Sequence, residues 1–191
     1  VGLDSIRLHN NKAYAGGTLR LLINNLNSDF FPTRGVDWAT EFTSQLGMSS
    51  HSKNYTALKS DLTLYTSVQR KPRVVGVFRV GGGKILSKDY EFFQAMTLGA
   101  NNYLRGFRKN RFAGDSYLNT GMEMRLRLFN LKSYILPGTL GAIGFAEIGR
   151  VWYEGEKSRR WHPSYGGGFY FLPFDMIMVS ALLGFSKEDR M

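Results

Sequence analysis

The strongest constraint on the fold is a strict alternation of side chains at residues 118–128. Apolar residues and one threonine occupy every second position from Leu118 to Leu128, and the positions between them include Glu123, Arg125 and Arg127. Successive side chains of a β-strand point to opposite faces of its sheet. The pattern therefore predicts a long, two-faced strand that carries full charges in the middle of its polar face.

The same alternation recurs along most of the chain, with clusters of turn-forming residues between the stretches. It predicts about eight strands, most of them roughly 9–13 residues long, whereas strands of soluble sheets have about 5–6 residues and a tilted membrane strand needs about 9–11. A weaker signal at Ile6 and Leu8 indicates the end of one further strand. The predicted strands are centred on residues 18–24, 36–46, 58–65, 74–80, 118–128, 140–152, 165–171 and 176–185.

The polar faces of these strands carry charges in mid-strand, at Glu41, Lys59, Asp61, Arg79, Glu123, Arg125, Arg127 and Glu147. A soluble sandwich would bury the apolar face and leave the charges in water, whereas a membrane barrel puts the apolar face in lipid and the charges in a wet lumen. Alternation alone fits both architectures. Strand length, short turns that alternate with longer loops, and aromatic residues near strand ends favour the barrel; these aromatic residues are Trp38, Tyr65, Trp152 and Tyr153.

Composition agrees with an all-β chain, since the 191 residues include 14 Phe, 10 Tyr and 22 Gly but only 5 Pro. The absence of cysteine excludes disulfides and thiolate metal sites. The three histidines, His9, His51 and His162, lie in separate loop-like stretches, so the sequence predicts neither a metal site nor a cofactor. The chain has no apolar run of about 18 residues and thus no predicted transmembrane helix.

Other motifs predict no chemistry in this region. The run Gly81-Gly82-Gly83-Lys84 lacks the frame and the following helix of a phosphate-binding loop, and we interpret it as a strand end. Ser, His and Asp residues are scattered without a nucleophile elbow, so we predict no enzyme activity. The net charge of +10 includes basic groups at 70–73, 108–111 and 157–160. We interpret these groups as solvated loops, with contacts to lipid or lipopolysaccharide phosphates as an open hypothesis, and we predict no nucleic-acid binding.

One segment, at about residues 84–115, breaks the alternation and is too long for a hairpin loop. Irregular segments of this length in a regular β chain are usually functional or disordered. Its apolar residues argue against disorder because such side chains require burial; they are Leu98, Tyr103, Leu104, Phe107 and Phe112. We therefore predict that the segment folds back against the rest of the protein.

Within this segment, Leu104-Arg105-Gly106-Phe107 resembles the (V/I/L)-R-G-(F/Y) signature of the outer-membrane assembly and translocation barrel superfamily. This is the bacterial surface antigen family, with the BamA-type insertases and the two-partner-secretion transporters. Further motifs agree in order over roughly residues 17–186. They are the turn Phe31-Pro32-Thr33-Arg34-Gly35, the loop continuation Arg111-Phe112-Ala113-Gly114, the glutamate-bearing Met122-Glu123-Met124-Arg125, and residues 144–152, where Glu147 replaces the family's usual aspartate.

The resemblance implies an all-β fold, an antiparallel transmembrane β-barrel region in the outer membrane of a Gram-negative bacterium. A complete barrel of this family has about sixteen strands, so about eight of them are expected here. The signature loop of the family joins the eleventh and twelfth strands, and the strands of this chain then correspond to the eighth through fifteenth. Residues 1–191 are thus expected to form one partial barrel domain whose last strand is missing, within a larger protein.

The resemblance also implies that the signature loop tucks into the lumen, where Arg105 meets Glu123 and Glu147. An arginine held away from bulk water requires charge-assisted partners, and its planar fork suits carboxylates. Gly106 would allow close backbone approach or a positive φ, and Phe107 and Phe112 would fill space against Phe145 and Gly149. Without the resemblance, Arg105 reads as a solvated loop residue. The expected site comprises Leu104, Arg105, Gly106, Phe107, Arg111, Phe112 and Gly114 of the loop, with Glu123, Arg125, Phe145, Glu147 and Gly149 as lumenal partners.

The function implied by the resemblance is protein assembly, membrane insertion or polypeptide translocation, without a cofactor. The implied partners are outer-membrane lipids and lipopolysaccharide, unfolded outer-membrane or secreted polypeptides, and periplasmic or lipoprotein accessory subunits. One alternative is a barrel that anchors or transports an upstream hydrolase of the phospholipase or phosphoesterase type. Another is a soluble β-rich binding domain whose similarity to the superfamily is accidental.

Overall fold

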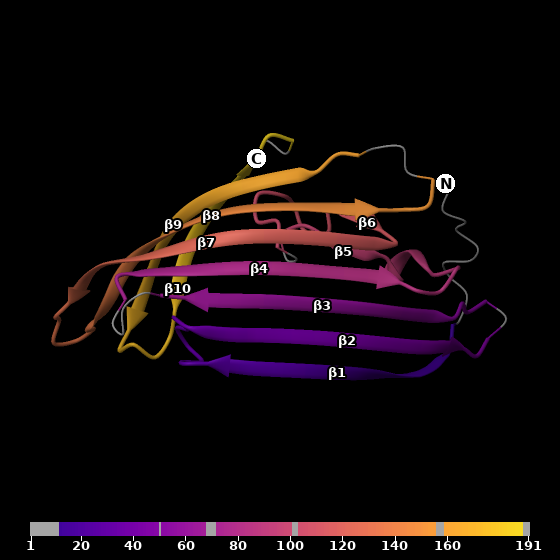
Figure 1. Cartoon of the computed structure of the whole chain (residues 1–191), viewed down its shortest axis with the longest axis horizontal. Helices are drawn as coiled ribbons and strands as arrows, with labels where there is room; N and C mark the ends of the chain where they lie inside the picture. The colour runs from indigo at the N-terminus through magenta and orange to yellow at the C-terminus, as the bar shows by residue number, and fades with distance from the viewer. Residues whose placement is uncertain (1–11, 50, 68–71, 101–102, 156–158, 189–191) are drawn as a thin grey trace.

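Eight long strands form one antiparallel sheet in the computed structural model, which describes residues 12–49, 51–67, 72–100, 103–155 and 159–188. They follow one another in chain order as a meander (Figure 1). The predicted all-β architecture with eight wall strands is confirmed, while Ile6 and Leu8 lie outside the described residues. The strands are β1 (Tyr14–Leu26), β2 (Gly35–Gly47), β3 (Tyr55–Thr66), β4 (Val74–Ile85), β7 (Ser116–Leu131), β8 (Gly138–Trp152), β9 (His162–Pro173) and β10 (Val179–Ser186).

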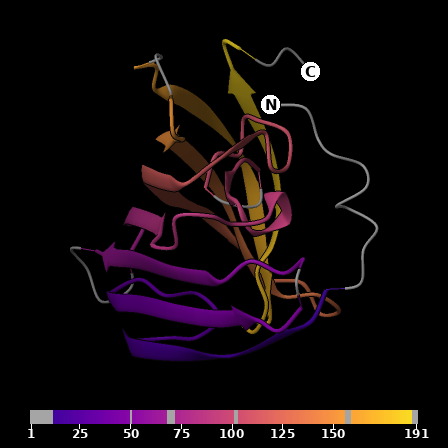
Figure 2. The same ribbon diagram turned by 90° about the vertical axis from the view of Figure 1, so that its right-hand side faces the viewer.

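The connection from β4 to β7 carries the signature loop, residues 86–115, and is built differently from the other connections. It contains the short helix η1 (Phe92–Gln94) and the strands β5 (Met96–Leu98) and β6 (Phe112–Gly114), which pair with each other. The large sheet is strongly curved, and the loop lies on its concave side (Figure 2). There β5 contacts β7 and β8, and β6 contacts β8. Among the described residues no helix is long and apolar enough to cross a membrane.

The sheet is not closed in the described part of the chain, because β1 and β10 form its two edges. It therefore has the form of a partial barrel, as expected. Since the strands form a meander, the connections after β1, β3, β7 and β9 lie at one end of the sheet. The signature loop lies at the opposite end, together with the connections after β2 and β8.

The two faces of the sheet carry the reverse of the pattern found in soluble proteins. On β7, Met122 and Met124 are 63% and 51% exposed on the convex face, whereas Glu123 and Arg125 are only 7% and 6% exposed on the concave face. Apolar side chains cover the convex face of the other strands as well, including Leu19, Phe42, Leu58, Phe78, Phe169 and Leu183. This arrangement confirms the barrel over the soluble sandwich, because only a lipid-facing surface makes an exposed apolar face stable.

Several strands extend beyond their predicted residues, and two of the differing boundaries have a clear structural reason. β4 continues to Ile85, so Gly81, Gly82 and Gly83 lie inside its ladder with β7 and not at a strand end. A methyl group at Gly83 would lie 2.5 Å from the Tyr117 ring, so the glycine makes room for a buried aromatic side chain that local alternation does not reveal. β10 begins at Val179 and not at Met176, because residues 174–176 form the turn that follows β9.

Candidate functional site

The signature loop is attached to the concave face by apolar side chains. Leu98, Leu104 and Phe107 are almost completely buried and belong to a cluster that includes Tyr117 of β7 and Val151 of β8. Backbone hydrogen bonds between residues close in sequence shape the loop around them. The Leu104 amide donates to the Gly99 carbonyl at 3.1 Å, and the Phe107 amide donates to the Leu104 carbonyl at 3.1 Å. Burial of these side chains therefore holds the backbone of Arg105 and Gly106 at the sheet.

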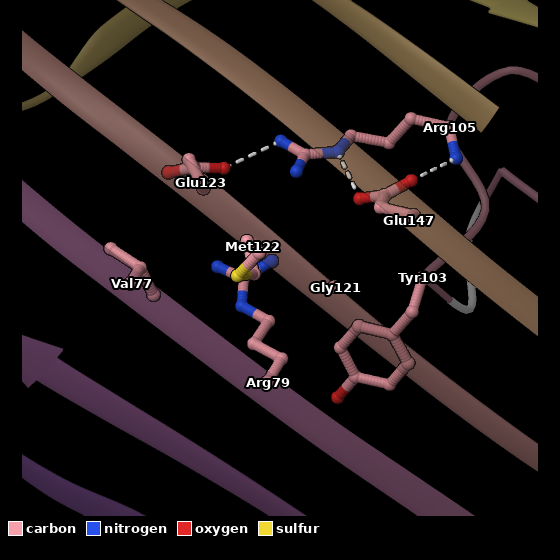
Figure 3. A pocket seen from close by; sticks show the side chains of 8 residues that line it. All are labelled: Val77, Arg79, Tyr103, Arg105, Gly121, Met122, Glu123 and Glu147. Carbon is pink, nitrogen blue, oxygen red and sulfur yellow. Dashed lines mark hydrogen bonds and ion pairs between the residues drawn. The ribbon is translucent and has the colours of Figure 1, made fainter.

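Arg105 bridges two neighbouring strands through their carboxylates (Figure 3). Its Nε donates to Oε1 of Glu147 on β8 at 2.6 Å, and its Nη1 donates to Oε2 of Glu123 on β7 at 2.7 Å. The backbone amide of Arg105 also donates to Oε2 of Glu147, at 2.7 Å. Both the guanidinium and the backbone of this one residue are thus tied to the sheet by charge-assisted hydrogen bonds, which are the strong class.

The two glutamates have further partners of their own. Arg125 Nε donates to the second oxygen of Glu123 at 2.7 Å, and the Ser164 hydroxyl donates to Glu147 at 3.2 Å. Both carboxylates are buried, and burying a charge costs several kcal/mol unless it is paired. Two arginines and two glutamates make this cluster formally neutral, so every buried charge in it is compensated.

The ring of Phe145 packs against the Arg105 guanidinium. The Arg105 guanidinium carbon lies 3.7 Å from the centre of the Phe145 ring, which is a cation–π contact. The ring in turn lies beside Gly166 of β9, where a methyl group would approach its Cζ to 2.6 Å. Phe145 thus orients the guanidinium between the two carboxylates.

The predicted packing of Phe107 and Phe112 against Phe145 is wrong. Phe107 and Phe145 belong to separate hydrophobic clusters, and the side chains nearest to Gly149 in the loop are Leu98 and Leu104. Phe145 and Gly149 are four residues apart on one strand, about 13 Å. Phe107 lies toward the Gly149 end of this span, in the cluster that contains Leu98 and Leu104.

Phe107 and Phe112 pack instead on each other and on His162 at the start of β9. The two phenylalanine rings meet edge to face at 5.1 Å, and Phe112 stacks on His162 at 3.8 Å. His162 Nδ1 lies 2.8 Å from Glu188, a residue that follows β10. These aromatic contacts attach the outer part of the loop to the β9–β10 hairpin.

The remaining predicted loop residues have distinct positions. Gly106 makes a close backbone approach, while the positive φ values of the described loop residues are found at Tyr103 and Asn110, with φ of 65° and 49°. Gly114 packs against the Trp152 carbonyl and Val151. Arg111 is exposed, and its guanidinium carbon lies 5.6 Å from the centre of the Phe112 ring.

Phe31 and Tyr65 contribute to the cluster although the sequence analysis did not include them among the site residues. The Arg125 guanidinium carbon lies 5.4 Å from the Phe31 ring and 5.7 Å from the Tyr65 ring, and Phe31 also packs on Tyr170 at 5.3 Å. Phe31 belongs to the Phe-Pro-Thr-Arg-Gly motif, which we interpreted only as a turn. An aromatic residue at the start of an otherwise polar turn is the sequence signal that could have identified Phe31 as a site residue.

Two tyrosines of the loop are held in their neutral form. Burial raises the pKa of Tyr103, and the negative charge of Asp61 raises it further. Burial likewise raises the pKa of Tyr90, whose hydroxyl donates a hydrogen bond to the Asp115 carboxylate. In the part of the chain that the structure describes, no three His, Cys, Asp or Glu side chains are grouped so that they could hold a metal ion.

A family model described as the Omp85 superfamily domain matches residues 9–169. Comparison with curated protein sequences gave no match. Seven chains of known structure match. One is BamA from Haemophilus ducreyi lacking POTRA domains 1–3, with a TM-score of 0.70 and 16% identity over 91% of this chain and 39% of that chain.

The present chain thus spans well under half of the BamA chain that it matches. At this identity the structural likeness establishes the fold, and the family model establishes the family because it covers most of the sequence. The inverted sheet and the ordered motifs agree with both results. The chain therefore belongs to the Omp85 superfamily and is a transmembrane β-barrel region of the bacterial outer membrane.

Proposed function

We propose that this chain is the barrel region of a machine that inserts outer-membrane proteins or translocates polypeptides, and that the Arg105 loop braces its lumen. The observation that carries the proposal is the bridge from Arg105 to Glu123 and Glu147, found in a chain of this superfamily. A loop that is tied to two wall strands by the same guanidinium resists displacement from either one.

The strength of the brace follows from the burial of the carboxylates. Removing one partner from a buried ion pair leaves the other charge uncompensated, at a cost of up to about 3–5 kcal/mol. Removal of the Arg105 side chain would leave two such carboxylates without this partner, and water in the lumen would lower the cost. Loop movement during gating would have to break both ion pairs and the backbone hydrogen bond together.

The proposed partners follow from the two faces of the sheet. Outer-membrane lipids and the acyl chains of lipopolysaccharide contact the convex apolar face, and unfolded outer-membrane or secreted polypeptides are the substrates. Periplasmic or lipoprotein accessory subunits are further proposed partners. Moving a polypeptide requires no bond chemistry in this region, so we propose no catalytic residue and no cofactor here.

Anchorage of an upstream hydrolase stays the alternative, and it concerns residues outside this chain. The sequence that precedes this region in the full-length protein distinguishes the two functions. Periplasmic repeat modules support assembly, whereas a phospholipase-like or phosphoesterase-like domain supports anchorage.

The brace is tested by Arg105→Ala in the full-length protein, measured both by heat-modifiable gel mobility and by assembly or secretion of a substrate. We expect the barrel to remain heat-modifiable while substrate assembly falls by at least about tenfold, the change that about 1.4 kcal/mol produces. The double variant Glu123→Gln/Glu147→Gln should have the same defect, because neutral amides no longer pair with the guanidinium.

Lys109→Ala is the matched control, since Lys109 is an exposed cation of the same loop. It should assemble substrate at the wild-type level. Wild-type behaviour of Arg105→Ala and of the double glutamate variant in both measurements would show that the ion pairs brace nothing.

A further inference from the structure

We propose that Gly184 of β10 is a positioning residue for the signature loop, because the backbone of β10 is the surface on which Arg105 and Gly106 rest. A methyl group at Gly184 would lie 2.5 Å from the Arg105 carbonyl oxygen, 2.7 Å from its carbonyl carbon and 2.9 Å from the Gly106 amide nitrogen. All three are backbone atoms, which cannot rotate away as a flexible side chain can. Any side chain at position 184 therefore displaces the loop or the strand.

The close approach is reciprocal. A methyl group at Gly106 would lie 2.7 Å from the carbonyl carbon of Phe185, the residue after Gly184, and 2.8 Å from Cβ of Ser164 on β9. Glycine is the one residue that lets two backbones meet at this distance. This contact supplies a physical reason for the glycine of the Arg-Gly-Phe motif, and it lies on β10 and not on the strands that carry the glutamates.

The ladder register shows how β10 can control an ion pair that lies three strands away. Glu123, Phe145, Gly166 and Gly184 are direct neighbours in one transverse row across β7, β8, β9 and β10. The backbone of Arg105 lies at Gly184, its guanidinium covers Phe145, and its Nη1 reaches Glu123. The Phe145 ring lies over Gly166, and the missing side chain of Gly184 leaves room for the Arg105 backbone. A side chain at position 184 would therefore lift the Arg105 guanidinium from Glu123.

The size of the side chain at position 184 therefore decides whether Arg105 of the signature loop can reach the carboxylates of Glu123 and Glu147. β10 meets the loop through backbone atoms, so movement of this strand would be transmitted to the loop directly. The inference goes beyond the proposed brace, which involves only β7 and β8. It also does not depend on the proposed function, because the position of the loop can be measured without a substrate.

The experiment uses the full-length protein in outer-membrane fragments and measures trypsin cleavage in the loop, after the exposed Arg108 and Lys109. Because the rate reports the population of displaced loop, we expect Gly184→Ala and Gly106→Ala each to be cleaved about tenfold faster than wild type. The double variant should be no faster than the faster single variant, since both remove one shared contact. The barrels should remain heat-modifiable.

Gly144→Ala on β8 is the control, because a methyl group there meets no atom within 4 Å. It should be cleaved at the wild-type rate. The proposal is overturned if Gly184→Ala behaves like Gly144→Ala, or if the two single effects multiply in the double variant.

If Gly184→Ala fails to form a heat-modifiable barrel, two further variants test the role of β10: Ser164→Gly alone and the double variant Gly106→Ala/Ser164→Gly. Ser164→Gly is added to Gly106→Ala, which removes the β9 contact of the new methyl group but leaves the Phe185 backbone in place. Cleavage should stay fast in this double variant. A return to the rate of Ser164→Gly alone would place the contact on β9 and overturn the role of β10.

Discussion

At the scale of single residues, the concave face of this sheet is governed by charges that cannot be left unpaired. Glu123 and Glu147 each use both carboxylate oxygens, toward Arg105, Arg125 and Ser164. Removing any one donor leaves a buried acceptor with the full cost of its desolvation, about 1–3 kcal/mol and more for a charged group. Small changes in this cluster are therefore expected to have larger effects than changes on the lipid-facing side.

Because of Tyr90, the attachment of the loop is expected to weaken at alkaline pH. Burial and the hydrogen bond to Asp115 raise its pKa above the ordinary value, so the folded protein keeps the phenolic proton more tightly than the unfolded chain does. The resulting stability is complete below the ordinary tyrosine pKa of about 10 and is lost as the pH rises through the folded-state value.

We therefore expect the wild type to lose thermal stability relative to Tyr90→Phe as the pH rises above about 10. The measurement is the temperature at which heat-modifiable mobility is lost, taken for both proteins from neutral to alkaline pH. Because other groups also titrate in this range, the difference between the two curves is the relevant quantity. Parallel curves for the wild type and Tyr90→Phe would contradict the role given to this hydroxyl.

At the scale of structural elements, two connections enter the concave side from opposite ends of the sheet. The signature loop enters between β4 and β7, and the β1–β2 turn enters from the other end with Phe31, Pro32 and Thr33 buried. They meet through the Glu123–Arg125 pair, because Arg125 is stacked on Phe31 while its Nε is bonded to Glu123. The turn is thus part of the structure that orients the loop.

Phe31→Ala should destabilise the barrel by about 3–5 kcal/mol, since it leaves a cavity against Tyr170 and uncovers Arg125. The adjacent Phe30→Ala is the control, because Phe30 is 62% exposed and its truncation opens no cavity. Stability is measured as the denaturant concentration at which heat-modifiable mobility is lost. Equal losses for Phe30→Ala and Phe31→Ala would show that burial of Phe31 does not support the cluster.

At the scale of the whole molecule, the convex face is an apolar belt and the concave face holds the charges. Such a sheet would aggregate in water, whereas in a bilayer it places each class of side chain in its favourable solvent. The curvature that encloses the loop also separates these two environments (Figure 2). Membership of the Omp85 superfamily and the structure of the sheet thus both indicate a location in the bacterial outer membrane.

Met122 tests the belt, since it lies on the convex face in the middle of β7. Met122→Arg should reduce the stability of the membrane-inserted barrel by about 2–4 kcal/mol, because a charge at the lipid face loses its hydration. Met122→Leu should be close to wild type, and both variants are compared by the heat-modifiable fraction in denaturant. A neutral effect of Met122→Arg, as for a surface residue in water, would contradict lipid exposure of this face.

The strand pattern, the inverted faces and the candidate Arg105 bridge were accessible from the sequence, for a local reason. Side chains on a strand alternate with a period of two, so the residues 118–128 alone show which positions share the face of Glu123. The resemblance then identified Arg105 and its carboxylates by motif. Strand ends such as Ile85 were less accessible, because glycines in a ladder and glycines in a turn look alike until their neighbours are known.

Contacts between segments that are distant in the sequence were decided only by the tertiary structure. Phe112 stacks on His162, Phe31 lies on Arg125 and Gly106 meets Gly184, and none of these pairs follows from local periodicity. Each depends on the register of several strands and on the path of a loop, and a shift of one residue in register turns every side chain to the opposite face. The sequence specifies which side chains need a buried partner, and the assembled sheet selects which partner lies within reach.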